Sequence, residues 1–270
     1  MQSFHDLAYV NAGHHRQKLD LFIPDEGKNF PLIIWVHGGA FRMGCKSDHV
    51  PLDYLDRGYA VASINYRLSQ HAIFPAQIED VKAAVRWLRV NAEKYGLDPN
   101  RFGAWGSSAG GHLVAMLGLT GMSNTFDVGE YLEISSQVQV VVDQFGPTDF
   151  LQMDTQRLPE GTIHDTSDSP ESELVGGPIQ ENRNRVAKAN PINYVSSEAP
   201  PFLIVHGDHD PLVPYQQSVM LNNALVTQGV SVSFYTVEGE GHGNFQDPNV
   251  AKITKKFLDR HLKKIVSTQS

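Results

Sequence analysis

Three residues with the side chains of acyl-transfer chemistry stand in short loops that are well separated along the chain. Ser108 is the central serine of a Gly-Ser-Ser-Ala-Gly segment, and Asp210 and His242 follow in loops rich in glycine and proline. Serine is a weak nucleophile near neutral pH, so it needs a base to take its proton, and that base needs a carboxylate to orient it. These residue types predict Ser108 as nucleophile, His242 as general base and Asp210 as the orienting acid.

The surroundings of Ser108 suit a nucleophile. An apolar run over 101–106 precedes it, and a segment rich in glycine, alanine and leucine follows over 110–119. This order predicts a strand that turns directly into a helix, which is the context that the Gly-x-Ser-x-Gly pattern requires. The tight turn strains the middle residue and pushes its side chain out at the edge of the sheet.

A second glycine-rich loop, His-Gly-Gly-Ala-Phe over 37–41, follows an earlier apolar run. A tetrahedral intermediate needs N–H donors about 3 Å from its oxygen, and glycines let the backbone approach that closely. We expect the backbone N–H groups of Gly38, Gly39 and Ala109 to form an oxyanion hole. His37 is expected to organise this loop and not to act as a base, and His112 to pack or hydrogen-bond beneath the site.

Asp208 is the competing orienting acid, but it comes directly after an apolar run, whereas Asp210 stands further out on the loop. The Asp-His-Asp segment over 208–210 also suits a simple turn, since aspartate is a common turn former. We favour Asp210. Glycines on both sides of His242 indicate an exposed loop, which argues against a core histidine.

Short apolar runs alternate with amphipathic helical patterns along most of the chain. This alternation predicts an α/β protein with one domain, 1–270, and a mostly parallel central sheet with helices on both faces. Apolar residues at helical spacing from Ile78 to Ala92, and the Asp247-Pro248 pair, predict two of these helices. Runs at 7–10 and 18–23 predict an antiparallel edge, 231–237 an outer strand, and 31–37, 59–66, 101–106, 138–145 and 201–206 inner strands.

The segment 147–200 breaks this alternation, because it is rich in polar residues, proline and glycine and has no long periodic pattern. Long irregular segments in compact domains are commonly lids or binding loops. We therefore predict a small lid excursion over Ser108 that shapes an acyl pocket. The residues expected to line that pocket are Phe41, Phe150, Leu151, Met153 and Leu158.

Composition excludes several other functions. The net charge is −8 and no basic run could follow a phosphate backbone, so nucleic acid is not an expected partner. No apolar stretch approaches the length of a membrane span, and residues 1–11 lack the pattern of a signal peptide. We expect a soluble protein, cytoplasmic as given and secreted if a leader peptide was removed.

Acyl transfer needs no cofactor, the single Cys45 forms no internal disulfide, and no metal site is expected. The sequence gives no indication of the oligomeric state.

The chain resembles the esterase and lipase branch of the α/β hydrolases, which includes bacterial hormone-sensitive-lipase-like enzymes and acetylxylan or feruloyl esterases. The order Ser, Asp, His fits that fold. Two features depart from the hormone-sensitive-lipase-like group: the glycine loop begins at residue 37, so we expect no long N-terminal cap, and Ser107 replaces a common acidic residue. The resemblance rests, beyond the triad, on Ile-Asn-Tyr-Arg-Leu at 64–68, Phe-Pro-Ala-Gln at 74–77, the helix at 80–91, Gly-Leu-Asp-Pro-Asn-Arg at 96–101 and Leu-Val-Gly-Gly at 174–177.

This resemblance implies an α/β-hydrolase fold and a carboxylic ester hydrolase that works through an acyl-enzyme. The expected substrates are small-molecule or carbohydrate esters with short-chain or aromatic acyl groups, and the motifs look most like the carbohydrate-acyl esterase subgroup. Two alternatives remain open. Some arylformamidases share the fold, the His-Gly-Gly loop and the triad order, and some non-catalytic relatives only bind ligands, although these usually lack a triad member.

Overall fold

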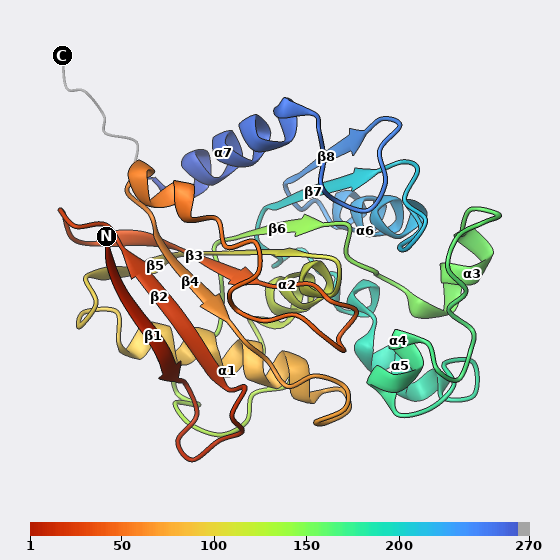
Figure 1. Cartoon of the computed structure of the whole chain (residues 1–270), viewed down its shortest axis with the longest axis horizontal. Coiled ribbons are helices and arrows are strands. Elements are labelled where there is room, and N and C mark those ends of the chain that lie inside the picture. The colour runs from red at the N-terminus through yellow and green to blue at the C-terminus, as the bar shows by residue number, and fades with distance from the viewer. Residues whose placement is uncertain (264–270) are drawn as a thin grey trace.

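The computed structural model describes residues 1–263 and contains one eight-stranded sheet with the order β1-β2-β4-β3-β5-β6-β7-β8 (Figure 1). All eight strands overlap the runs that the sequence predicts. The strands are β1 (Gln2–Ala8), β2 (Lys18–Ile23), β3 (Phe30–Val36), β4 (Ala60–Ile64), β5 (Leu97–Ser107), β6 (Val140–Gln144), β7 (Phe202–Gly207) and β8 (Val232–Val237).

Strand directions follow the prediction of an antiparallel edge on a parallel sheet. β1 pairs antiparallel with β2, and β2 pairs antiparallel with β4. Every other neighbouring pair is parallel, and β8 is the strand at the opposite edge. The carboxyl ends of the parallel strands therefore meet at one edge of the sheet, where ligands bind in open α/β folds.

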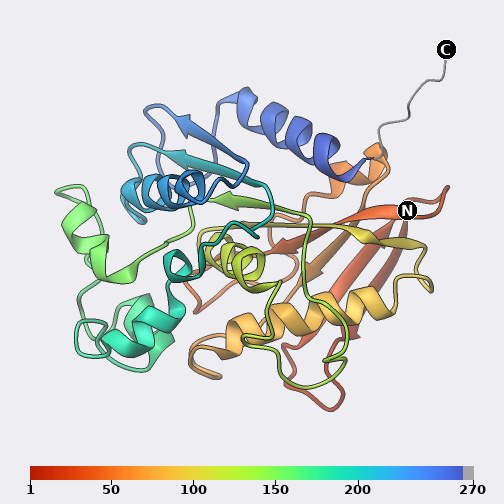
Figure 2. The same cartoon turned by 180° about the vertical axis from the view of Figure 1, so that it is seen from behind.

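Helices cover both faces of the sheet (Figures 1 and 2). One face packs against α1 (Ala76–Val90), α2 (Ala109–Thr120) and α6 (Gln216–Thr227), whose apolar side chains share one core with that face. The other face packs against α7 (Pro248–Leu262) and the short 3-10 helix η1 (Leu52–Arg57). Both predicted helices are present, and Asp247 caps α7 by accepting a hydrogen bond from the backbone N–H of Asn249.

The connection from β3 to β4 holds only η1, which spans six residues. On the same face, the C-terminal half of α7 packs closely on the sheet, since a Cβ at Gly103 would lie 2.8 Å from Leu262 Cδ1. The N-terminal half of α7 lines a cleft instead, through residues that include Pro248, Val250 and Thr254. This face of the sheet is thus incompletely covered near the carboxyl ends of its strands.

The segment 147–200 is more regular than the sequence indicates. It holds five short helices, none longer than seven residues, which leaves too few turns for a periodic apolar pattern. Two of them begin at a capping side chain: Asp149 accepts a hydrogen bond from the backbone N–H of Leu151 at η2, and Ser169 accepts one from that of Ser172 at α4. The helices are η2 (Phe150–Gln152), α3 (Met153–Gln156), α4 (Pro170–Val175), α5 (Arg183–Ala189) and η3 (Pro191–Tyr194).

Within residues 1–263, no helix combines the length and the apolar character that crossing a membrane requires.

Candidate active site

Ser108 lies on the sharp turn between β5 and α2. Its backbone is strained, with φ 55° and ψ −122°. A Cβ at Gly106 would lie 2.3 Å from the carbonyl oxygen of Gly110, and a Cβ at Gly110 would lie 2.0 Å from that of Val36. Both positions therefore admit only glycine, which explains the spacing of the Gly-x-Ser-x-Gly segment and confirms the strand–turn–helix prediction.

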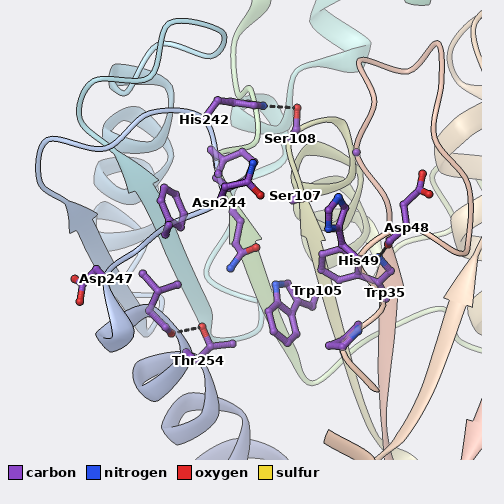
Figure 3. A pocket seen from close by; sticks show the side chains of 18 of the residues that line it. Trp35, Asp48, His49, Trp105, Ser107, Ser108, His242, Asn244, Asp247 and Thr254 are labelled. Atoms are coloured by element: carbon purple, nitrogen blue, oxygen red, sulfur yellow. Dashed lines mark hydrogen bonds between the residues drawn. The ribbon is translucent and has the colours of Figure 1, made fainter. Parts of the chain in front are cut away.

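The turn brings Ser108 to His242, and the loop after β7 brings Asp210 to the same histidine. Nε2 of His242 lies 3.0 Å from the Ser108 hydroxyl (Figure 3), and its Nδ1 lies 2.6 Å from Oδ2 of Asp210. Asp208 has other partners: it bonds the ring of exposed His209 and the backbone N–H of Gly239. The acid in contact with His242 is thus Asp210.

Asp210 is buried at a point where four donors surround its carboxylate. Oδ1 accepts hydrogen bonds from the backbone N–H groups of Leu212 and Val213, and Oδ2 accepts from His242 and from Nε2 of His206 at 3.1 Å. Burial alone would raise the pKa of Asp210, but the hydrogen bonds from His206 and His242 outweigh it and hold that pKa well below its usual range. Asp210 is therefore ionised and keeps the proton of His242 on Nδ1, which leaves Nε2 free to accept from Ser108.

The glycine loop after β3 approaches the nucleophile closely. A Cβ at Gly38 would lie 2.8 Å from the carbonyl oxygen of Ser107 and 3.3 Å from Ser108 Cβ. Gly39 has a φ of 114°, in the region that favours glycine, and a Cβ there would lie 2.3 Å from the Met43 carbonyl. In the described part of the chain, the backbone N–H groups of Gly39 and Ala109 donate to no protein acceptor.

The two other histidines near Ser108 have structural partners. His37 is buried and stacks on Tyr66 with ring centroids 4.5 Å apart, and burial lowers its pKa to about 4. His112 is also buried, its Nδ1 bonds the carbonyl of Pro147, and burial lowers its pKa to about 4 as well. Both predictions, a loop-organising His37 and a packed His112, agree with this geometry.

A cleft of about 1050 Å³ opens at Ser108 and runs along the incompletely covered face of the sheet. Ser108 and His242 lie at one end, and Trp35 and Trp105 lie farther along, with Thr254 of α7 on the opposite wall (Figure 3). The two indole rings pack edge to face, 5.5 Å apart. Polar side chains on the walls include Asp48, His49, Gln144, Asn244, Gln246 and Asp247.

The predicted pocket residues do not line this cleft, so that prediction is wrong. Phe41 is only 1% exposed, and Phe150 and Met153 are 0% exposed. Phe150 stacks on His112 at 5.1 Å, on the α2 side of the sheet. Leu151 and Leu158, although partly exposed, are also absent from the cleft wall. Its buried apolar residues belong to the core, and no residue of 147–200 lines the cleft, so this segment does not form the predicted lid over the acyl pocket.

Three histidine rings also come together away from the cleft. One ring nitrogen from each of His14, His15 and His71 lies within 4.8 Å of the others. The backbone N–H of Arg16 donates to Nδ1 of His14, and that of Leu68 donates to Nδ1 of His71. A neutral ring that accepts at Nδ1 carries its proton on Nε2, so two of the three rings offer no free lone pair to a metal ion. We assign no metal site there.

The family comparison agrees with this geometry. The model of the BD-FAE family matches residues 19–225, which is most of the chain and includes both glycine loops and Asp210. The chain belongs to the BD-FAE family. This family of α/β hydrolases accounts for the fold, because solved structures of α/β-hydrolase esterases superpose on nearly the whole chain.

Individual relatives of this BD-FAE protein carry esterase names. The structure described as a truncated form of carbohydrate esterase from gut microbiota is 35% identical, with a TM-score of 0.88, and covers 98% of this chain and 97% of its own. An acetyl ester-xyloside bifunctional hydrolase from Caldicellulosiruptor lactoaceticus is 25% identical, with a TM-score of 0.75, over 90% and 86%. Esterase LipQ of Mycobacterium tuberculosis is 32% identical over 89% of this chain, but the chain spans only 56% of that esterase.

Sequence reasoning missed three groups that the structure places at the site. His206, at the end of β7, shares Asp210 with His242, and Arg16 reaches the glycine loop from the β1–β2 connection. Trp35 and Trp105 form part of the cleft and pair in register on neighbouring strands. The sequence does carry a signal for the tryptophans. Trp105 stands three residues before Ser108 in one predicted strand, and Trp35 lies in another. Residues paired on neighbouring strands face the same side of the sheet.

Proposed function

We propose that this protein is a serine carboxylic ester hydrolase that acts on acylated carbohydrates. The observation that carries the proposal is the hydrogen-bonded chain from Ser108 through His242 to Asp210, at 3.0 Å and 2.6 Å. It lies beside the glycine loop at the edge of the sheet where ligands bind. The names of the relatives over most of the chain support the same reaction class.

In the first half of the reaction, Ser108 Oγ attacks the acyl carbon of the ester and its proton passes to Nε2 of His242. The carbonyl π electrons move onto the oxygen, which becomes an oxyanion. We assign the donors that stabilise it to the backbone N–H groups of Gly38, Gly39 and Ala109, the last at the N-terminus of α2. The ester C–O bond then breaks, and His242 returns the proton to the departing alcohol.

In the second half, a water molecule attacks the acyl-enzyme with His242 again as the base. The intermediate collapses, the bond to Ser108 Oγ breaks, and the free carboxylic acid leaves while Ser108 regains its proton. Throughout, Asp210 remains ionised and stabilises the imidazolium form of His242. These steps require no cofactor.

The cleft supports a carbohydrate ester as the substrate. Its volume of about 1050 Å³ is far larger than an acetyl ester of a small alcohol would fill. Aromatic rings on one side and hydrogen-bonding side chains on the walls suit a sugar, which presents C–H faces and hydroxyl groups. The gut-microbiota relative is named a carbohydrate esterase, and the Caldicellulosiruptor relative is named an acetyl ester-xyloside bifunctional hydrolase.

The test compares kcat/KM for acetylated xylo-oligosaccharides, methyl ferulate, ethyl acetate and N-formylkynurenine, with Ser108→Ala as the blank. We expect acetylated oligosaccharides to exceed ethyl acetate by at least about 10-fold, because the cleft contacts the sugar as well as the acyl group. Equal values for the two would contradict a carbohydrate substrate. Preference for N-formylkynurenine would favour arylformamidase, and inactivity on all four would favour a ligand-binding role.

A further inference from the structure

Arg16 stands in the connection between β1 and β2, 92 residues before the nucleophile, yet its guanidinium lies against the glycine loop. Its Nε donates to the carbonyl of Tyr66 at 2.7 Å. Its Nη2 lies 3.2 Å from Nε2 of His37 and donates to the carbonyl of Gly44 at 3.0 Å. The side chain thus bonds both ends of the loop 37–44.

These contacts determine which nitrogen of His37 carries the proton. A guanidinium only donates hydrogen bonds, so Nε2 of His37 must accept the one from Arg16. The proton of the neutral ring is then on Nδ1, which donates to the carbonyl of Gly38 at 2.6 Å. Burial lowers the pKa of His37 to about 4, which keeps the ring neutral in this arrangement near pH 7.

The bond to the Gly38 carbonyl also orients the following N–H group. A trans peptide is planar, so the carbonyl of Gly38 and the N–H of Gly39 point in opposite directions. Because His37 holds that carbonyl on its own side, the Gly39 N–H is held on the other side of the loop. Gly38 itself is pressed against the turn of Ser108, which leaves the loop little room to move.

We propose that Arg16 is a positioning residue for the oxyanion hole, acting through the tautomer of His37 and the carbonyl of Gly38. This inference rests on the proposed esterase function. Arg16 contacts neither the substrate nor Ser108, so we expect little effect on substrate binding. Its effect should fall on the transition state, because the oxyanion that the hole stabilises forms only there. A purely structural role in tying the β1–β2 connection to the sheet would lower stability and leave the affinity for a tetrahedral anion unchanged.

The decisive variant is Arg16→Lys, which keeps the charge but cannot reach Tyr66, His37 and Gly44 together. Arg89→Lys is the matched control. Arg89 is likewise partly buried and donates to three backbone carbonyls, of Pro99, Ser135 and Gln137, at the opposite end of β5 from Ser108. Each protein is assayed for kcat, KM and Tm on p-nitrophenyl acetate. Each is also titrated with benzeneboronic acid, whose boron accepts the Ser108 oxygen and becomes a tetrahedral anion.

For Arg16→Lys we expect kcat to fall about 10- to 100-fold with KM within 3-fold, since losing one oxyanion donor outright costs about 100- to 1000-fold. The boronate inhibition constant should rise in step, while Arg89→Lys changes neither. A parent-like kcat, or a loss shared equally by Arg89→Lys, would overturn the proposal. If the parent protein itself did not hydrolyse p-nitrophenyl acetate, the proposed esterase function would be refuted instead.

His37→Phe, which keeps the ring stacked on Tyr66 but makes no hydrogen bond, provides an independent arm. If Arg16 acts through His37, this variant should lose kcat and boronate affinity by a similar factor. The double variant should then be no worse than His37→Phe alone, because the two residues act in series. Additive losses, with the double variant falling by the product of the two factors, would show that Arg16 acts by another route.

Discussion

Oδ2 of Asp210 lies 3.1 Å from Nε2 of His206, so the acid that orients the catalytic imidazole is itself held by a second one. Nε2 of His206 also lies 3.0 Å from the carbonyl of Val213, an acceptor, and must therefore carry the proton. Its Nδ1 lies 2.7 Å from the Ser218 hydroxyl. These contacts orient His206 so that its Nε2 donates to Asp210.

We expect His206→Phe to lower kcat/KM by about 10- to 100-fold, because a hydrogen bond to a charged group contributes about 1.5 to 3 kcal/mol. Phenylalanine retains the ring contacts with Phe145 and Tyr215. Ser218→Ala, which removes only the group behind His206, should have a smaller effect. Steady-state kinetics checks both, and a His206→Phe enzyme as active as its parent would show that the second imidazole is dispensable.

The acid limb of the pH–rate profile should reflect one proton. His242 must be neutral to accept the proton of Ser108, whereas Asp210 has a pKa held well below its usual range and stays ionised over the working pH range. Log(kcat/KM) should therefore rise with a slope of about one as pH increases. Rates measured between pH 4 and 8 on an uncharged ester test this expectation, and a slope near two would mean that a second group must also ionise.

Asp143, at the carboxyl end of β6, should make stability pH-dependent. Burial raises its pKa to about 7, although the hydrogen bond from the Gly146 N–H opposes this. The carboxyl pKa is 3.8 in the unfolded chain and about 7 in the folded protein. The free energy of unfolding therefore falls as pH rises between these two values, by at most about 4 kcal/mol. Asp143→Asn removes that penalty and still offers an acceptor to Gly146.

Denaturant unfolding of Asp143→Asn and its parent at pH 5 and pH 8 measures this effect. The variant should be the more stable protein at pH 8, and its advantage should shrink at pH 5. An advantage that is independent of pH would show that Asp143 does not titrate in this range.

Phe150→Ala should destabilise the protein without changing acyl preference. The ring is fully buried against His112 and Phe41, and truncation of a buried phenylalanine costs about 3 to 5 kcal/mol. Chemical unfolding and the ratio of kcat/KM for acetyl and butyryl esters provide the two readouts. A stable variant with a shifted ratio would restore the pocket role that the cleft geometry contradicts.

Much of the fold was predictable because the strands are buried and their apolar runs are nearly continuous. The Gly-x-Ser-x-Gly turn and the His-Gly-Gly loop were also predictable, since backbone contacts of 2.0 to 2.8 Å at Gly110, Gly106 and Gly38 leave no room for a side chain. Such steric constraints appear directly in the sequence. The placement of Asp210 and His242 followed from the shared edge of the parallel strands.

The cleft was not predictable in the same way. Its existence depends on how little of the sheet η1 and α7 cover, which is a property of packing between distant segments. Phe150 and Met153 were assigned to a lid because their neighbours in sequence are polar, whereas their burial depends on α2 and its surroundings. Arg16 and His206 contact the site through hydrogen bonds that span long separations or depend on loop conformation, and no local pattern marks them.

The nucleophile is tested most directly by mass spectrometry of the protein after reaction with a fluorophosphonate, whose phosphorus is attacked by an activated serine with loss of fluoride. Because His242 Nε2 lies 3.0 Å from the Ser108 hydroxyl, we expect one phosphonyl group per chain, located on Ser108 by fragment spectra. Ser107→Ala should be labelled like the parent, and Ser108→Ala should not be labelled. Absence of label on the folded parent, or a label that resides on Ser107, would contradict the assignment of Ser108 as the nucleophile.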